Sequence, residues 1–256
     1  MASRRNTPDR PRLTARSVIA STLLGVDPPS LPTRSLVASA ELLGVSAGTA
    51  RVAMSRMVAA GELEPDGDGY RLAGHLLQRQ ARQTVSRTGT TRPWDGTWRT
   101  ALVPGEARAA ADRADLRRAM TGLRFGELRD GVWLRPDNLT APLPEAVVGL
   151  TGALDPAVDP AVLARSLWDL DGWAEAATAL RAELAPLQAR LDDGDGRALA
   201  DGFVTSAAVL RHLQADPLLP VELLPASWPG ADLRADEERF DQRFKAVLRT
   251  VLLDGS

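Results

Sequence analysis

Apolar residues between Ser46 and Gly61 recur three and four positions apart, the spacing of one face of an α-helix. This apolar face consists of Ala50, Ala53, Met54, Met57 and Val58. Ser46 has the hydroxyl of a helix N-cap, and Gly61 has the backbone freedom that the residue after a helix needs. Residues 33–43 predict a second short amphipathic helix, and residues 44–45 the tight turn between the two helices. The pattern therefore predicts a helix-turn-helix.

Two short strands are predicted directly after this motif. Leu63 and residues 70–72 flank a turn-rich tip at residues 65–69, which is typical of a hairpin. A helix-turn-helix followed by a hairpin is a winged helix. Upstream, residues 14–24 predict a further helix and residues 25–32 a loop.

The predicted second helix of the motif has an outward face that suits contact with DNA. Its polar side chains are those of Ser46, Thr49, Arg51, Ser55 and Arg56. Such side chains donate hydrogen bonds to phosphates and guanine edges, and no carboxylate occurs between residues 46 and 61. We expect Arg51 and Arg56 to contact DNA, and the three hydroxyl residues to position the helix on phosphates. The alternative is a packed helix with solvated arginines, because the whole chain has 30 arginines and a single lysine, Lys245.

The middle of the chain predicts a small α+β unit. Strands are expected at residues 98–103, 125–128, 132–135 and 146–154, and a helix at residues 107–122. Asp130-Gly131 is a strong hairpin signal between the second and third strands. A strand, a helix, a hairpin and a last strand together predict a ferredoxin-like α/β sandwich.

The last third predicts a helical domain. Leucine and other apolar residues alternate by three and four over residues 173–191, where Pro186 is expected to kink the helix. A second helix follows around residues 203–213, and the prolines of residues 216–230 exclude a continuous helix there. A final stripe from Phe240 to Leu252 is either core or part of a dimer seam. The predicted domains are 1–12, a mobile basic arm; 13–92, the winged helix and linker; 93–158; and 159–256.

Charge is distributed unevenly along the chain, whose formal net charge is −2. Residues 1–92 hold 13 arginines and 7 acidic residues, whereas the remainder holds 18 basic and 26 acidic residues. A basic first third on an acidic body suits a DNA-reading head. With no cysteine, no long apolar run and no signal-peptide pattern, we expect a cytoplasmic protein without disulfides.

No catalytic motif occurs in the sequence. The chain has two histidines, no paired carboxylates at a catalytic spacing, and no HExxH, GxSxG, P-loop or GxGxxG pattern. The acidic run at residues 192–196 lacks the later ligands of a calcium loop. We therefore expect no enzyme activity, no cofactor and no metal.

Several motifs occur together in this order: LGVSAGTARVAMSRMVAAGEL, WDGTWRTALVP, LRRAMTGLRFGELRDGVWLRP, SLWDLDGW and DPLLPVELLPASWPG. With them the sequence resembles the PaaX-type transcriptional regulators, the phenylacetate-degradation repressor family. The resemblance implies a winged helix, a ferredoxin-like middle domain similar to a CRISPR-adaptation nuclease, and a helical C-terminal domain. It also implies a homodimer that represses a catabolic operon on a double-stranded DNA operator and is released by an aryl-acetyl-CoA thioester.

An acyl-CoA effector requires arginines for its phosphates and an apolar pocket for its acyl group. Arg113 and Arg117 lie four positions apart on one helical face and could share a phosphate. Trp133, Trp168 and Trp173 are the candidates for the pocket, since ligand sites favour domain interfaces. The alternative for the arginines is a solvated face paired with nearby acids. The alternative for the whole chain is a sensor or scaffold that binds no DNA and whose winged helix contacts proteins.

Overall fold

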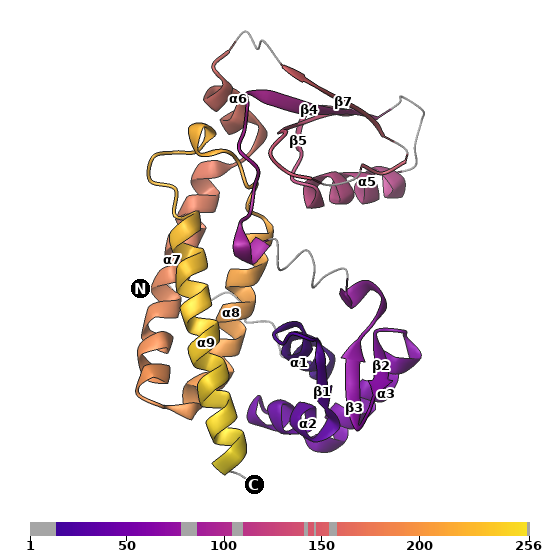
Figure 1. The fold of residues 1–256 in the computed structure, drawn as a ribbon, viewed down its shortest axis with the longest axis vertical. Helices are drawn as coiled ribbons and strands as arrows, with labels where there is room; N and C mark the ends of the chain where they lie inside the picture. Colours follow the sequence, from indigo (N-terminus) through magenta and orange to yellow (C-terminus); the bar gives the residue numbers. More distant parts are fainter. Residues whose placement is uncertain are drawn as a thin grey trace, which may run out of the picture. The chain divides into compact units, whose positions relative to one another are not determined.

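The computed structural model of the protein describes residues 14–77, 86–103, 110–140, 143–145, 147–153 and 158–254 (Figure 1). The described part combines helices with two small antiparallel sheets, and its C-terminal region is helical. The predicted mixed α+β class is confirmed. The predicted mobile arm, residues 1–12, lies outside the described residues.

The chain divides into two compact units. The first contains residues 1–81, 187–204 and 242–256, and the second contains residues 82–186 and 205–241. The long C-terminal helices thus contribute to both units. The three domain boundaries expected from the sequence stay predictions.

The first unit begins with three helices and a three-stranded sheet. In chain order these are α1 (Ala15–Leu24), β1 (Ser30–Pro32), α2 (Thr33–Leu42), α3 (Ala47–Ala59), β2 (Leu63–Asp66) and β3 (Gly69–Leu72). Helix α1 starts at a capping box, in which the Thr14 hydroxyl accepts a hydrogen bond from the Ser17 amide and Ser17 returns one to the Thr14 amide.

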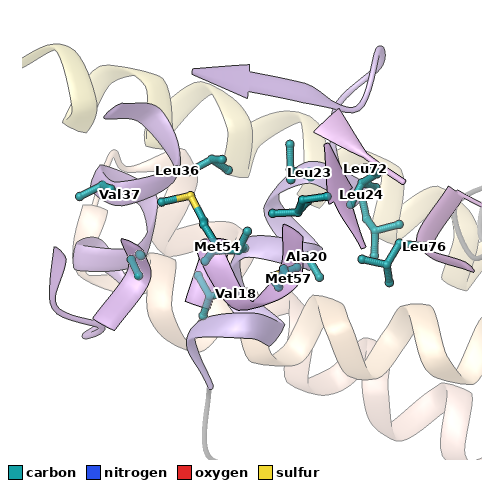
Figure 2. Packing of buried hydrophobic residues seen from close by; sticks show 14 of the residues in the cluster. Val18, Ala20, Leu23, Leu24, Leu36, Val37, Met54, Met57, Leu72 and Leu76 are labelled. Carbon is teal, nitrogen blue, oxygen red and sulfur yellow. The ribbon is translucent and has the colours of Figure 1, made fainter. Parts of the chain in front are cut away.

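One apolar core holds together the three helices and three strands of residues 15–72, which we call the head. The three helices each bury one face, and the two hairpin strands close the cluster (Figure 2). Its largest fully buried members are Ile19, Leu23, Leu36, Met54, Met57, Leu63, Leu72 and Leu76. Phe203 of α8 (Leu199–Gln214), which belongs to the same unit, packs against this cluster. Burial of such side chains stabilises the head by about 1.5–3 kcal/mol each.

The strand β1 lies where the sequence predicts a loop. It pairs antiparallel with β3, so that β3 is central in the order β1-β3-β2. The predicted tip of residues 65–69 is also shorter, because Pro65, Asp66 and Gly69 belong to the paired strands. Gly69 permits the close approach of β1: a Cβ at this position would lie 2.0 Å from the carbonyl oxygen of Leu31.

The second unit contains a four-stranded antiparallel sheet and one helix packed on it. Its elements are β4 (Thr97–Leu102), α5 (Ala110–Gly122), β5 (Gly126–Arg129), β6 (Val132–Pro136) and β7 (Val148–Ala153). The strand order is β5-β6-β4-β7, and every neighbouring pair is antiparallel. The hairpin predicted at Asp130-Gly131 joins β5 to β6, and Gly131 has a φ of 76°.

The two faces of this sheet bury different partners. On one face, Ala101 and Trp133 pack against Met120 of α5 and against Phe125. On the other, Trp98 and Leu134 pack against apolar residues of α6 (Pro160–Leu167) and of the segment after α8, namely Leu163, Ala164, Leu219 and Leu223. The sheet is therefore covered on both sides.

The C-terminal helices are α6 (Pro160–Leu167), α7 (Leu170–Asp192), α8 (Leu199–Gln214) and α9 (Gly230–Asp254), with 3-10 turns at Gly196–Ala198 and Val221–Leu223. Pro186, where the sequence predicts a kink, lies inside α7 and does not interrupt it. In the apolar stripe of α9, Phe240 and Val247 are buried within the single chain.

Candidate nucleic-acid interface and ligand cavity

The start of α3 is fixed by local chemistry that the sequence predicts. Ser46 is the N-cap, and its hydroxyl accepts a hydrogen bond from the Thr49 amide at 3.3 Å and lies 2.8 Å from the Thr49 hydroxyl. Gly44 takes a φ of 80° in the turn before it, and Gly61 takes a φ of 68° after its end. These caps satisfy backbone groups that a helix leaves open.

The outward face of α3 is polar and carries positive charge. Thr49, Arg51, Ser55 and Arg56 are all exposed, whereas the opposite face is buried. Neither arginine has an ion pair or a hydrogen bond to any described residue. Within the described part of the chain, both guanidinium groups are therefore available to a ligand without first losing a contact.

The β2–β3 hairpin differs from α3 in charge. Its tip carries Asp66 and Asp68, and its one arginine, Arg71, is paired with Glu64 on the neighbouring strand. Ser30 donates a hydrogen bond to the Asp66 carboxylate at 2.6 Å. A hairpin with this charge is a poor partner for phosphate, so α3 is the face of the head that suits nucleic acid.

A partly buried ion pair joins α1 to the segment after α3. Arg16 donates to both carboxylate oxygens of Glu62, with the Nε bond at 2.8 Å, and Glu62 is only 7% exposed. The hydrogen bonds from Arg16 hold the pKa of Glu62 below its usual value, against the opposing effect of burial. This ion pair holds the segment directly after the C-terminal end of α3 against α1.

A cavity of about 250 Å³ lies within the second unit. Apolar residues of α6, the sheet and the segment after α8 form much of its wall, and three charged residues, Arg117, Arg124 and Glu127, join them. The apolar members are Phe125, Trp133, Leu167, Trp168, Ala215 and Pro217.

Arg135 supports one wall of the cavity from behind. Its guanidinium lies over the ring of Phe125, 4.8 Å from the centroid, and donates to the carbonyl oxygens of Leu123 and Leu139. Burial lowers the pKa of Arg135 to about 10, which still leaves it charged at neutral pH. The contact stabilises Phe125 in its position.

The structure brings together three of the five residues predicted for an effector. Arg117, Trp133 and Trp168 line the cavity. Trp173 does not, because its ring stacks between His212 and Trp228 at centroid distances of 4.4 and 4.3 Å. Arg113 is exposed on α5 and is absent from the cavity wall. Arg117 forms an ion pair with Glu127 at 2.8 Å.

Sequence reasoning missed Arg124, the second basic residue of the cavity wall. It follows α5 and has a φ of 67°, a left-handed conformation that an arginine rarely adopts. Its guanidinium donates to the Ser86 hydroxyl at 2.8 Å. No sequence signal marks this position, because glycine or asparagine would be expected there.

Two further functional classes find no support in the described part of the chain. Its histidine, aspartate and glutamate side chains do not gather in groups that could hold a metal ion. None of its helices combines the length and the apolar character required to cross a membrane.

Three family models match the chain in succession. Residues 14–76 match the PaaX-like protein model, residues 91–153 the PaaX protein central Cas2-like domain, and residues 168–252 the PaaX-like protein C-terminal domain. Among solved structures, an uncharacterized protein, Rv0674 from Mycobacterium tuberculosis, is 42% identical, with a TM-score of 0.75. The match covers 93% of this chain and 99% of that one. Curated proteins gave no match.

Proposed function

The chain belongs to the PaaX-like family of transcriptional regulators, and from that premise we propose that it is a DNA-binding repressor of a catabolic operon. The observation that carries the proposal is the exposed face of α3. It presents Arg51 and Arg56, which form no ion pair with any described residue, and has no carboxylate along its length. Base edges and phosphates accept the hydrogen bonds that such a face donates.

We further propose that the head is a winged helix, in which α2 and α3 form the helix-turn-helix and the β2–β3 hairpin forms the wing. The element order and the antiparallel pairing of β1, β3 and β2 support this assignment. For the middle domain, the order β5-β6-β4-β7 with antiparallel neighbours supports a ferredoxin-like arrangement. In it, α5 connects β4 to β5, two strands that both pair with β6.

Binding as a homodimer is part of the proposal, because one winged helix reads a half-site and a dimer reads two. Light scattering of the purified protein at micromolar concentration should give the mass of two chains. A single-chain mass, both with and without DNA, would contradict this part. The effector that we propose is an aryl-acyl-CoA thioester, whose binding lowers affinity for the operator.

The direct test is to recover and sequence the DNA fragments that the purified protein retains, and then to measure affinity for a recovered fragment at several salt concentrations. Neutralised phosphates release counterions, so the logarithm of the affinity should fall linearly with the logarithm of salt, by roughly 0.9 per phosphate. Enrichment of one sequence with such a slope supports a sequence-specific regulator. Absence of binding at low salt would favour a sensor or scaffold.

A further inference from the structure

The polar face of α3 contains one large apolar side chain that the fold leaves in solvent. Val52 is 52% exposed, although it belongs to a helix whose other side is buried. An α-helix makes one turn in about 3.6 residues, so Val52 projects nearly opposite to Ala50 and Met57, which are both buried. Packing within the described head therefore gives no reason for a valine at this position.

The position of Val52 relates it to the two arginines of this face. Arg56 lies one turn further along the same side of α3, and Arg51 directly precedes Val52 on its other flank. Neither guanidinium bonds to a described residue. An apolar group between two such cations suits a surface that offers negative charge or acceptors beside a small apolar group.

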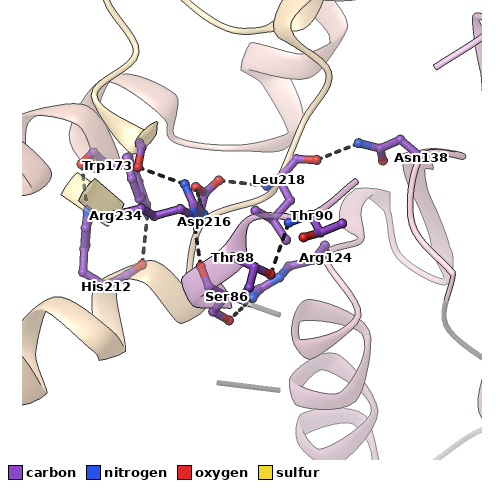
Figure 3. Close-up of polar contacts among 11 residues, drawn as sticks. Ser86, Thr88, Thr90, Arg124, Asn138, Trp173, His212, Asp216, Leu218 and Arg234 are labelled. Atoms are coloured by element: carbon purple, nitrogen blue, oxygen red, sulfur yellow. Dashed lines mark hydrogen bonds and ion pairs between the residues drawn. The ribbon is translucent and has the colours of Figure 1, made fainter. Parts of the chain in front are cut away.

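Two arginines of the second unit show the contrast, because their guanidinium groups hold the fold together. Arg124 donates to the Ser86 hydroxyl at 2.8 Å, and Arg234 donates to the buried carboxylate of Asp216 at 2.6 Å (Figure 3). The guanidinium groups beside Val52 form no such bonds within the described chain. A partner that covers Val52 must therefore also supply acceptors for the N–H donors of these arginines.

The major groove of DNA meets both requirements. Its base edges and the phosphates beside it accept hydrogen bonds from arginine, and thymine adds a C5-methyl group to the base edges. A valine side chain has two methyl groups and no polar atom, so this methyl group is the part of a base edge that it matches. Over any other base it would cover polar atoms that lose their hydrogen bonds to water. Valine also keeps one preferred χ1 rotamer in a helix, so its methyl groups are held in a fixed position.

The residue one turn before Val52 on this face is a glycine. A Cβ added at Gly48 would meet nothing within 4 Å, and glycine is a poorer helix former than alanine. The described part of the fold therefore does not require a glycine there. A position without a side chain lets the backbone approach a ligand closely, and the first residues of a recognition helix are those that contact base edges.

We propose that Val52 is a specificity-determining residue, which packs against the C5-methyl group of a thymine in each half-site of the operator. Arg51 and Arg56 hold the helix on either side of this contact through bonds to phosphates or base edges. The inference rests on the proposed function, because it requires that α3 enter the major groove. It adds the identity of one base pair, an A·T pair whose thymine faces Val52.

The test removes single methyl groups from a DNA fragment that the wild-type protein retains. Each thymine in turn is replaced by deoxyuridine, which pairs as thymine does but lacks the C5-methyl group, and affinity is measured by fluorescence anisotropy. Replacement at one position of a half-site should weaken binding about fourfold, the effect of one apolar carbon that is no longer buried.

Val52→Ala assigns this effect to a residue. The change removes both methyl groups from an exposed site, so the thermal unfolding midpoint should stay near that of the wild type. At the sensitive position, the variant should bind thymine and deoxyuridine within about twofold of each other. The matched control is Val162→Ala, which truncates a valine of α6 that is 57% exposed. This control should keep the affinity of the wild type and its response to deoxyuridine.

Two results would overturn the inference and leave the DNA-binding function intact. One is sequence-specific binding that no deoxyuridine replacement weakens by more than about twofold, a result that the wild-type protein alone decides. The other is a full response at the sensitive position in Val52→Ala, or in Val52→Ser should the alanine variant fail to fold. If the wild type retains no DNA at low salt, the proposed function fails, and the inference fails with it.

Discussion

Replacement of Arg51 and Arg56 by alanine should weaken operator binding and leave stability unchanged. Both side chains are exposed on α3 and bond to no described residue. The free energy of unfolding should therefore change by at most about 0.5 kcal/mol. A bidentate contact to a base is worth about 1–3 kcal/mol. Arg51→Ala should therefore lose roughly tenfold in affinity or more.

Fluorescence anisotropy of a labelled operator at several salt concentrations separates the two kinds of contact. Loss of a phosphate contact should weaken binding to all sequences and reduce the salt slope by about 0.9, whereas loss of a base contact should relax specificity at one position. The control is Arg165→Ala, which removes an exposed arginine of α6 that bonds to no described residue. Unchanged affinity with Arg51 and Arg56 both replaced would refute the assignment of α3 as the reading helix.

Three further predictions concern stability, measured by urea unfolding. Arg16→Ala should destabilise the head by about 1–3 kcal/mol at pH 7, since it leaves the carboxylate of Glu62 buried without its partner. The deficit should shrink as pH falls through the lowered pKa of Glu62; a constant deficit would contradict this. Met54→Ala should cost about 2–5 kcal/mol, and a smaller loss would mean that the core collapses around it. Burial lowers the pKa of His212, although the hydrogen bond to the Trp173 carbonyl and the charge of Asp216 act in the opposite direction. Because the folded state disfavours the protonated imidazole, stability should fall as pH drops below about 6.5. His212→Gln should flatten that dependence.

The head was predictable because its signals are local. The Ser46 cap, the apolar spacing of α3 and the φ of Gly61 all depend on residues within one or two turns. Strand β1 was not predictable, since it has three residues, and its pairing of Ser30 with Arg71 joins positions far apart in the sequence.

The candidate ligand site was predictable only in part. Arg117 and Trp133 follow from residue type and the expected domain interface. Trp173 lies outside the cavity because its ring stacks on Trp228, a partner that no local pattern indicates. Arg124 depends on a left-handed backbone conformation that the sequence does not encode in a recognisable way.

The chain contains no cysteine, so a thiol introduced by substitution can be labelled at one chosen position. This allows a direct test of whether α3 contacts the operator. Ser55→Cys places a single thiol on the exposed face of α3, where a DNA-cleaving iron chelate can be attached. We expect cleavage of a retained DNA fragment within a few base pairs of each half-site, abolished by excess unlabelled fragment. Bound DNA with no localised cleavage, or with uniform cleavage along the fragment, would contradict the claim that α3 reads the operator.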